Sequence, residues 1–364
     1  MIKALQVCVM KILFGQEDYV ARVKAYLSVR HSVSQLLLCS LPLQTEKPDA
    51  TSFDWEMARA RLQGMPHDAE VFVAFSQKYH RDAKQLLEDE GFSHLVFYDA
   101  ALDNRLKEEY FRHVFADEGR EFLLLSEMEE EHLPVKRLVE VYLAKCVVDK
   151  PIAGYPQELP AEVIPIQVGA ALTPERIAAV TDDTGDNIST RNRRYSEMTA
   201  FYWMWKNAHA DYLGLCHYRR LWVNLPGIVQ KLCTTDVDAV LPLPTLCEHS
   251  VYEDYLLKHI PEVWRPMLKV LREQSPDYAK AAQKLFKGRI FYASNMCILR
   301  REVLDDLCAW MFPIVMEVER IVGDLPDRYY NRYAGFCTER LITLYFLYNE
   351  KHWRIAHAEK IFIG

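Results

Sequence analysis

The sequence lacks the features that mark several large classes of protein. None of its nine cysteines forms a Cys-x-x-Cys pair, and most lie in apolar runs, so we expect reduced, buried thiols rather than disulfides or a zinc site. No apolar run is long enough to span a membrane. The net charge of −7 argues against general nucleic-acid binding, which needs a basic face, but allows a local basic pocket for an anionic ligand.

The N-terminal stretch also lacks the marks of a signal peptide. Residues 2–14 are interrupted by Lys3, Gln6 and Lys11, and no small-residue cleavage site follows. We expect a core element here, and we place the protein in the cytoplasm, including the inner face of the membrane.

What is present indicates two α/β domains. The chain of 364 residues is long enough for both, and half of its residues are hydrophobic. Apolar runs at 71–75 and 95–98 predict strands, each followed by a helical pattern, and this alternation predicts a parallel sheet. We therefore predict a small Rossmann-like domain over residues 1–125. It has no Gly-x-Gly-x-x-Gly loop, so an accessory or interaction role is favoured over dinucleotide binding.

An acidic segment, 126–137, is typical of a solvated linker and marks the predicted boundary. The second domain, 138–364, opens with an alternating strand. Pro261 should divide a helical region into two pieces, because proline cannot continue a helix. The last helix is predicted from Gly335 to Tyr348.

The most informative stretch of the second domain runs from Asp211 to Trp222. Its apolar first half predicts a buried strand, which leads directly into His217, Tyr218, Arg219 and Arg220. Adjacent cations and an imidazole are hard to explain as core residues. The carboxyl end of a strand in an α/β sheet is also where ligands usually bind.

This stretch is one of six blocks that resemble a known family. The blocks are Ile164–Leu172, Asp183–Ser189, Tyr202–Asn207, Gly214–Arg220, Asn295–Met296 and Gly335–Leu341. They resemble, over about residues 138–364, the bacterial glycosyltransferase-like family called domain of unknown function 4422, whose members occur in capsular-polysaccharide and O-antigen clusters. The resemblance implies a GT-A-like fold and transfer of a hexosyl unit from a nucleotide sugar. A UDP-linked galactofuranose or galactose and a saccharide or lipid-linked acceptor are the expected substrates.

Departure of a nucleoside diphosphate requires positive charge. Most GT-A enzymes supply it with Mn²⁺ or Mg²⁺ on an Asp-x-Asp pair. The comparable strand end here carries His217, Arg219 and Arg220 instead, and guanidinium groups bind phosphate without a metal. We therefore leave both a metal-dependent and a metal-free reaction open. Asp236 and Asp238, together with His217, are the weaker metal candidates, since the two acids precede their strand and more simply face solvent.

The loop from Asp182 to Ser189 follows the first strand of the matched region, a position that suits nucleotide recognition. The candidate nucleotide-sugar residues are Gln167, Gly169, Asp182, Asp186, Asn187, Asn192, Tyr218, Arg220 and Asn295. The alternative is an Asx-rich turn that caps the next helix, with Gln167 and Gly169 in strand packing. Asn295 could equally satisfy a bulge.

An inverting transferase also needs a base that takes the acceptor proton, and carboxylates do this work. Glu339, in a matched block, is the predicted base; its alternative role is a helix N-terminal charge paired with Arg340. The predicted catalytic set is thus Glu339, Arg219 and His217, with Glu197 a weaker candidate. Tyr202 and its aromatic neighbours on the same helix are better explained as core.

The leading hypothesis is a glycosyltransferase of cell-surface polysaccharide assembly. A second is a non-catalytic nucleotide- or sugar-binding protein that keeps the fold. A third is an interaction scaffold that oligomerises through residues 1–137. Binding without turnover, or an oligomer held by the first domain, would distinguish these two from the enzyme.

Overall fold

The computed structural model describes residues 10–29, 31, 35–42, 44–47, 50–152 and 158–363. The chain divides into two compact units, Met1–Glu121 and Phe122–Gly364. Both are α/β units with parallel strands, so the prediction of a two-domain α/β protein is confirmed. Of the N-terminal stretch predicted to be a core element, residues 2–9 lie outside the described part, and the rest contributes to the first strand.

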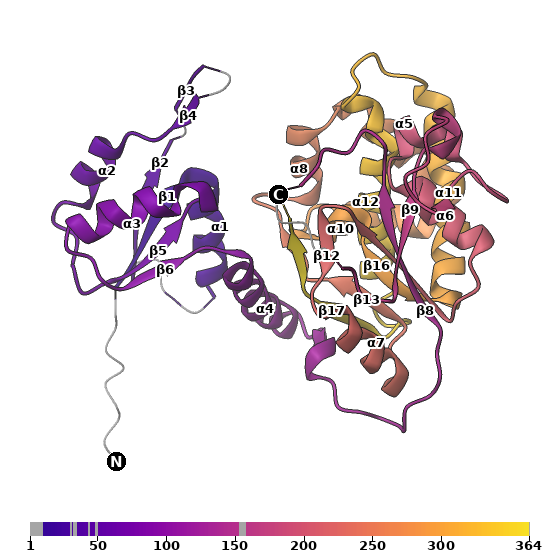
Figure 1. Ribbon diagram of the computed structural model, residues 1–364, viewed down its shortest axis with the longest axis horizontal. Coiled ribbons are helices and arrows are strands. Elements are labelled where there is room, and N and C mark those ends of the chain that lie inside the picture. Colours follow the sequence, from indigo (N-terminus) through magenta and orange to yellow (C-terminus); the bar gives the residue numbers. More distant parts are fainter. Residues whose placement is uncertain are drawn as a thin grey trace. The chain divides into compact units, whose positions relative to one another are not determined.

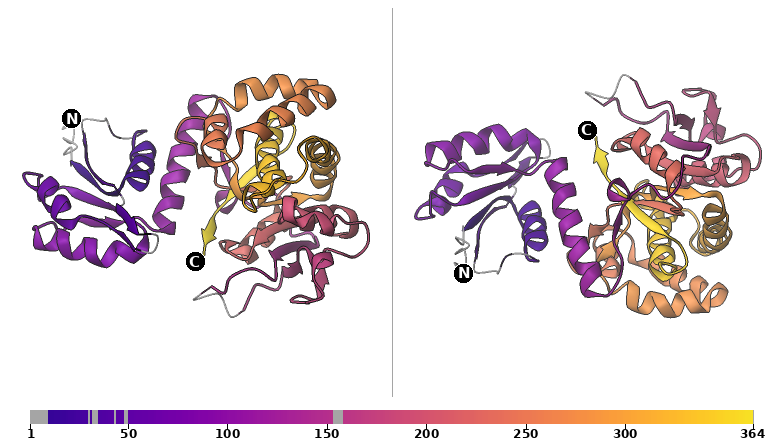
Figure 2. Two further views of the ribbon diagram at one scale, coloured as in Figure 1. Left: turned by 90° about the horizontal axis from the view of Figure 1, so that it is seen from above. Right: turned by 90° about the horizontal axis from the view of Figure 1, so that it is seen from below.

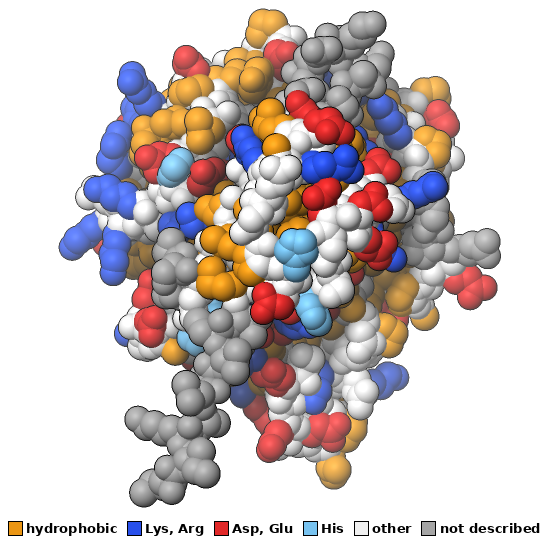
Figure 3. Space-filling view, turned by 90° about the vertical axis from the view of Figure 1, so that its left-hand side faces the viewer, with side chains coloured by type: hydrophobic (Ala, Val, Ile, Leu, Met, Phe, Trp, Pro, Cys, Tyr) orange, Lys and Arg blue, Asp and Glu red, His pale blue; other side chains and the backbone are white. Residues whose placement is uncertain are grey.

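The N-terminal unit is built on a four-stranded parallel sheet with the order β2-β1-β5-β6. Its elements are β1 (Lys11–Gln16), α1 (Glu17–Leu27), β2 (Leu36–Leu41), β3 (Gln44–Lys47), β4 (Ala50–Ser52), α2 (Trp55–Leu62), β5 (Glu70–Ala74), α3 (His80–Asp89), β6 (Leu95–Phe97) and α4 (Ala100–Asp117). Asp54 and Asp99 cap α2 and α4 by accepting backbone hydrogen bonds. On the face drawn in Figure 3, basic, acidic and hydrophobic side chains are interspersed.

The second unit begins earlier than the sequence predicts. Leu123–Leu124 forms β7, which pairs in parallel with β17 (Ile355–Ala358). Lys231 donates a hydrogen bond to the Met128 carbonyl, and Arg354 forms an ion pair with Glu131. The predicted linker, 126–137, therefore packs on the second unit. The acidic composition of this segment predicted a solvated linker. The residues that contact it, Lys231 and Arg354, lie about 100 and 220 residues later, so no local pattern indicates them.

The second unit contains a ten-stranded mixed sheet, which Figure 1 shows with its helices. The remaining strands are β8 (Val139–Lys145), β9 (Val163–Gln167), β10 (Val180–Thr181), β11 (Tyr212–His217), β12 (Arg220–Trp222), β13 (Ala239–Pro242), β14 (Thr245–Leu246), β15 (Ile290–Phe291), β16 (Cys297–Arg300) and β18 (Lys360–Phe362). Along the path β10-β9-β8-β11-β16-β13-β17-β7, only β16 runs against its neighbours. β12 and β18 form an antiparallel ribbon at the end of β11.

Helices pack on the sheet and against one another. They are α5 (Asn192–Tyr195), α6 (Met198–Asn207), α7 (Leu225–Thr234), α8 (Val251–Lys258), α9 (Pro261–Gln274), α10 (Pro276–Leu285), α11 (Arg301–Val322) and α12 (Tyr333–Tyr348). α7 buries Leu225 and Leu232 in one cluster with Val141 and Leu143 of β8. α9 to α12, orange to yellow in Figure 2, contact each other, and α11 also contacts β11 and β16.

Several predicted features are present, and others were missed. Pro261 divides α8 from α9 as expected, since it occupies the first turn of the second helix. The predicted last helix is α12, which begins two residues earlier than expected and ends at Tyr348. The sequence did not indicate β17 and β18, which follow it. Such short strands carry too few residues for a readable period. Among the described residues, no helix is long and apolar enough to cross a membrane.

Candidate functional site

One edge of the second sheet gathers the polar side chains that the sequence singled out. β9, β8 and β11 are parallel neighbours, so their carboxyl ends, at Gln167, Lys145 and His217, lie at the same edge. β16 runs the other way, and the turn that precedes it, 293–295, therefore also lies there. This is the edge at which open α/β sheets usually bind ligands.

Two arginines lie together at this edge. β11 ends at His217, Tyr218 and Arg219 form a tight turn, and Arg220 pairs back onto His217. The guanidinium carbons of Arg219 and Arg220 lie 4.9 and 5.4 Å from the centre of the Phe362 ring. The turn thus brings both cations to one aromatic side chain, whereas an extended chain would point them to opposite sides.

In the part of the chain that the structure describes, these two guanidinium groups have no hydrogen-bonding partner. Neither makes a hydrogen bond or an ion pair with any residue that the structure describes, and both side chains are partly exposed. Lys360, two residues before Phe362, donates from Nζ to the Ala293 carbonyl (3.0 Å) and to Ser294 Oγ (3.1 Å). The carboxyl edge therefore presents two guanidinium groups to which no described side chain is hydrogen-bonded.

Two glutamates meet at the turn before β16. Glu339 Oε1 accepts a hydrogen bond from the Ser294 backbone N–H (2.7 Å), and Glu197 Oε1 accepts one from Asn295 Nδ2 (2.8 Å). Burial raises the pKa of Glu339, and the nearby Glu197 adds to this, although Arg340 opposes it. The pKa of Glu197 is lowered despite burial, because the Asn295 hydrogen bond and the charge of Arg332 favour its ionised form. Carboxylates whose pKa values are driven apart are a frequent feature of acid–base sites.

The backbone around these carboxylates is strained. In the described part of the chain, four non-glycine residues have positive φ, and three of them are Ser196 (51°), Ser294 (84°) and Asn295 (51°). Each costs about 1–3 kcal/mol and persists only where the surroundings enforce it. Such strain is concentrated at functional sites more often than elsewhere.

The His217 side chain is buried at this edge of the sheet. Its side chain is 8% exposed, and its Nε2 is buried with no hydrogen bond to a described residue. Burial lowers its pKa to about 4, Arg220 and Lys360 act in the same direction, and Glu197 opposes them. The imidazole is therefore neutral at pH 7 and faces protein groups, which fits a positioning role better than direct contact with a ligand.

Most predicted nucleotide-binding residues in the loop after β9 bind the protein itself. Asp182 is fully buried and accepts from the backbone N–H groups of Gly169 (2.8 Å) and Ala170 (3.0 Å). Gln167 bonds the backbone of residues 175 and 177. Asn187 bonds the backbone of its own turn. These contacts correspond to the Asx-turn and packing alternatives.

Two other residues of this loop have different surroundings. Asp186 is exposed and accepts a hydrogen bond from the Tyr202 hydroxyl (3.2 Å). Asn192 donates from Nδ2 to the Ser196 carbonyl (2.7 Å) and so connects the loop to the strained turn. Asp186 is therefore the loop carboxylate that remains open to a ligand.

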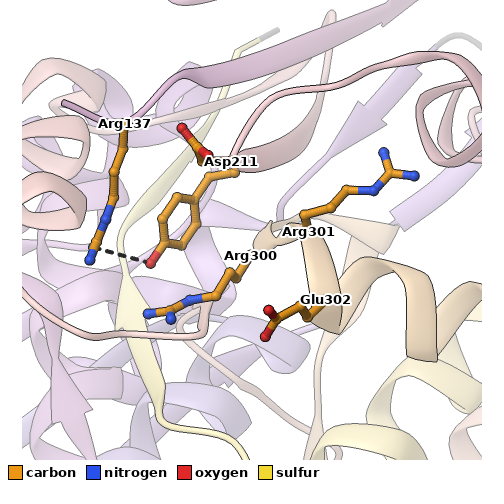
Figure 4. Close-up of a pocket in the computed structure, with 6 residues that line it drawn as sticks. Arg137, Asp211, Arg300, Arg301 and Glu302 are labelled. Carbon is orange, nitrogen blue, oxygen red and sulfur yellow. Dashed lines mark hydrogen bonds between the residues drawn. The ribbon is translucent and has the colours of Figure 1, made fainter.

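Asp236 and Asp238 lie at the opposite edge of the sheet, before β13. Asp236 pairs with Arg137 (3.1 Å), and Asp238 pairs with Arg300 (3.3 Å). A pocket of about 220 Å³ at this edge is lined by Arg137, Asp211, Tyr212, Arg300, Arg301 and Glu302. Figure 4 shows Arg137 directed at the Tyr212 hydroxyl and Arg301 directed away. Its arginines are bonded to protein groups, so this pocket is the weaker site.

The structure brings to the same edge six residues that the sequence singled out: His217, Tyr218, Arg219, Arg220, Asn295 and Glu339. The sequence analysis gave Glu197 a lower rank and did not consider Lys360 or Phe362. No local signal marks the last two, because their place depends on pairing between β12 and β18.

Comparison with known proteins identifies a family and a similar structure. Residues 153–350 match the family model described as domain of unknown function (DUF4422). The apo structure of WbbM, a bifunctional glycosyltransferase, is similar with a TM-score of 0.54 and 24% identity, over 62% of this chain and 45% of that chain. The present chain thus spans less than half of that protein, and the likeness concerns the fold. No curated protein matches significantly. Because the family model covers more than half of its residues, the protein belongs to the DUF4422 family.

Proposed function

We propose that the second unit is a GT-A-like glycosyltransferase domain that transfers a hexosyl unit from a nucleotide sugar to a saccharide acceptor. The fold it shares with a bifunctional glycosyltransferase supports this, as does the cationic carboxyl edge of its sheet. A UDP-linked galactofuranose or galactose is the proposed donor. A growing cell-surface polysaccharide, free or lipid-linked, is the proposed acceptor.

The observation that carries the proposal is the pair of unpaired guanidinium groups at Arg219 and Arg220. These two cations are partly exposed and form no hydrogen bond or ion pair with the described residues. Guanidinium groups bind phosphate oxygens through paired hydrogen bonds. A diphosphate at this edge would supply the missing negative charge.

The chemistry follows from that placement. In a single displacement, the acceptor hydroxyl oxygen bonds to the anomeric carbon while the bond from that carbon to the diphosphate breaks. The electron pair leaves on the diphosphate, where Arg219 and Arg220 offset the growing charge. The hydroxyl proton passes to a carboxylate of the site. Phe362, packed against both guanidinium groups, holds them in place.

The residues at this edge do not fit a site for Mn²⁺ or Mg²⁺. Such ions prefer several carboxylate or carbonyl oxygens, and the described residues contain no group of three His, Cys, Asp or Glu that could hold a metal. The Asp236 and Asp238 pair faces arginines at the other edge. We derive no step through a metal, and we expect transfer to persist in the presence of a chelator.

Thermal unfolding with and without ligand tests the proposal. UDP, UDP-galactose and UDP-galactofuranose are each added to the wild type, to Arg219→Ala and to Arg320→Ala. Arg320 is an exposed arginine that pairs with Glu317 on α11 and serves as the matched control. Ligand at 100 times its Kd should stabilise the protein by about 2.7 kcal/mol. We expect a raised Tm for the wild type and Arg320→Ala only.

Turnover is then measured with p-nitrophenyl hexoside acceptors, by release of UDP. No Tm shift with any of the three ligands would rule out the proposed donor class. A Tm shift without turnover across the acceptor panel would favour the binding protein over the enzyme. Full turnover by Arg219→Ala would refute the leaving-group role of that residue.

A further inference from the structure

Two carboxylates, Glu339 and Glu197, lie in the site, and their hydrogen bonds indicate different roles. Glu339 uses both oxygens inside the protein: Oε1 accepts from the Ser294 N–H (2.7 Å), and Oε2 accepts from Arg340 Nη1 (2.8 Å). The Arg340 side chain is 1% exposed, so its positive charge depends on buried partners. Both carboxylate oxygens of Glu339 are therefore bonded to groups of the protein.

Glu197 is bonded less fully by other residues. Its Oε1 accepts from Asn295 Nδ2 (2.8 Å), whereas Oε2 accepts no hydrogen bond from any other described residue. Glu339, by contrast, is paired with the Arg340 cation. Of the two carboxylates, Glu197 is therefore the one with no cation bonded to it among the described residues.

The backbone holds Glu197 in this position. Ser196, directly before it, has φ 51° and ψ −129°, a conformation that non-glycine residues avoid. Its N–H donates to the Asn192 carbonyl (2.7 Å), its carbonyl accepts from Asn192 Nδ2 (2.7 Å), and its Oγ accepts from Arg332 Nε (2.9 Å). All three polar groups of Ser196 are thus hydrogen-bonded and maintain the strained turn. This fixes the direction in which the Glu197 side chain points.

The partner side chain is held in the same way. Asn295 has φ 51°, is 1% exposed, and donates from Nδ2 to Glu197 and to the Gly335 carbonyl (3.2 Å). Ser294 before it is fixed by Glu339 and Lys360. Two strained turns, 98 residues apart in sequence, thus meet in one hydrogen bond between Asn295 and Glu197.

The charges around Glu197 keep it ionised. The Asn295 hydrogen bond and the positive charge of Arg332 lower its pKa, while Glu339 is the neighbour of like charge whose own pKa is raised. Protonation of Glu339 would remove the negative charge that pairs with the buried Arg340, whereas Glu197 can take up a proton without breaking such an ion pair.

We propose, on the basis of the transferase function above, that Glu197 is the catalytic base and that Glu339 is a positioning residue. In the reaction, the O–H bond of the acceptor breaks and its proton moves to Glu197 Oε2. The oxygen bonds to the anomeric carbon of the donor, and the diphosphate departs with the electron pair of the broken bond. Glu339 acts through Ser294 and Asn295, which align Glu197.

The test compares Glu197→Gln with Glu339→Gln, and Glu317→Gln on the exposed face of α11 serves as the control. Glu197→Gln keeps shape but removes the basic oxygen. It should lower kcat at least about 100-fold, the lower range for loss of a general base, with unchanged affinity for UDP. Glu197→Asp should recover part of kcat. Glu339→Gln should instead lose stability, and its remaining activity should keep the wild-type pH profile.

The outcomes separate this proposal from the transferase function. If the wild type neither binds UDP-galactose or UDP-galactofuranose nor releases UDP, the transferase function fails and the role of Glu197 falls with it. If the wild type turns over and Glu197→Gln retains its kcat, the assignment of the base is overturned while the function stands. A folded Glu339→Gln that alone loses kcat and the acidic limb of the pH profile would transfer the role to Glu339.

Discussion

Replacing Glu339 with glutamine should destabilise the second unit far more than the same change at Glu197. Glu339 joins a buried arginine to the turn at Ser294. Among the described residues, that arginine, Arg340, has one other acidic partner, Asp254 at 3.2 Å. Asp254 is in turn shared with Lys258. The loss of the Glu339 charge would therefore leave Arg340 with half of its compensation.

The magnitude follows from the bonds that change. Glutamine has one acceptor oxygen, so it can satisfy either the Ser294 N–H or Arg340, and its amide group would face the other donor. A hydrogen bond to a charged group contributes about 1.5–3 kcal/mol, and removal of one partner from a buried ion pair costs about 3–5 kcal/mol. We expect the free energy of unfolding to fall by about 3 kcal/mol for Glu339→Gln.

At Glu197 the same replacement is mild. The new carbonyl oxygen can still accept from Asn295 Nδ2, and the neighbouring His217 is neutral at pH 7, so no ion pair is lost. We expect a change of about 1 kcal/mol or less, the range of a single neutral hydrogen bond.

Urea unfolding followed by tryptophan fluorescence measures both values. Six of the seven tryptophans lie in residues 122–364, so the signal reports mainly the second unit. Arg340→Met should also destabilise, and the Glu339→Gln/Arg340→Met double variant should lose less than the sum of the two. Additive losses, or a Glu339→Gln variant as stable as the wild type beside a strongly destabilised Glu197→Gln, would refute the assignment of Glu339 to the fold.

Three further predictions concern binding, pH and backbone geometry. Phe362→Ala should weaken UDP binding about fivefold, because each of the two guanidinium groups loses an exposed contact worth about 0.5 kcal/mol, and isothermal titration would detect this. The unfolded chain protonates His217 and His259 below about pH 6.5, whereas the fold lowers their pKa values to about 4 and about 3. Urea stability should therefore fall from pH 6.5 towards 4, and His259→Phe should flatten the decline. Gly169→Ala should lower the midpoint of urea unfolding, because φ is +67° and the new methyl would lie 2.8 Å from Asn192 Oδ1; an unchanged midpoint would contradict this.

The sequence allowed the framework of the site to be predicted, since the apolar run before His217 is a strong strand signal and parallel strands share their ligand edge. It could not show that Tyr218 and Arg219 form a turn. Nor could it show that Phe362, the aromatic residue that both arginines contact, comes from β18, about 140 residues later, because that pairing leaves no local pattern. The same holds for Glu197, whose partner Asn295 lies 98 residues away.

The polar loop shows a different limit. Asp182 suits either a ribose or a turn, because in both cases a carboxylate accepts two or three hydrogen bonds. Only the structure reveals that Gly169, Ala170 and Ser189 already supply them. Residue type identifies what a side chain can bind, whereas the fold decides whether the partner is the protein or a ligand.

Titration of UDP into the wild type, an Arg219→Ala/Arg220→Ala double variant and Arg320→Ala tests the central claim most directly. If the two unpaired guanidinium groups hold the diphosphate, the double variant should bind UDP at least about 100-fold more weakly, since each charged hydrogen bond contributes about 1.5–3 kcal/mol. Arg320→Ala should bind like the wild type. Equal affinity in all three proteins, or no binding by the wild type, would contradict the account.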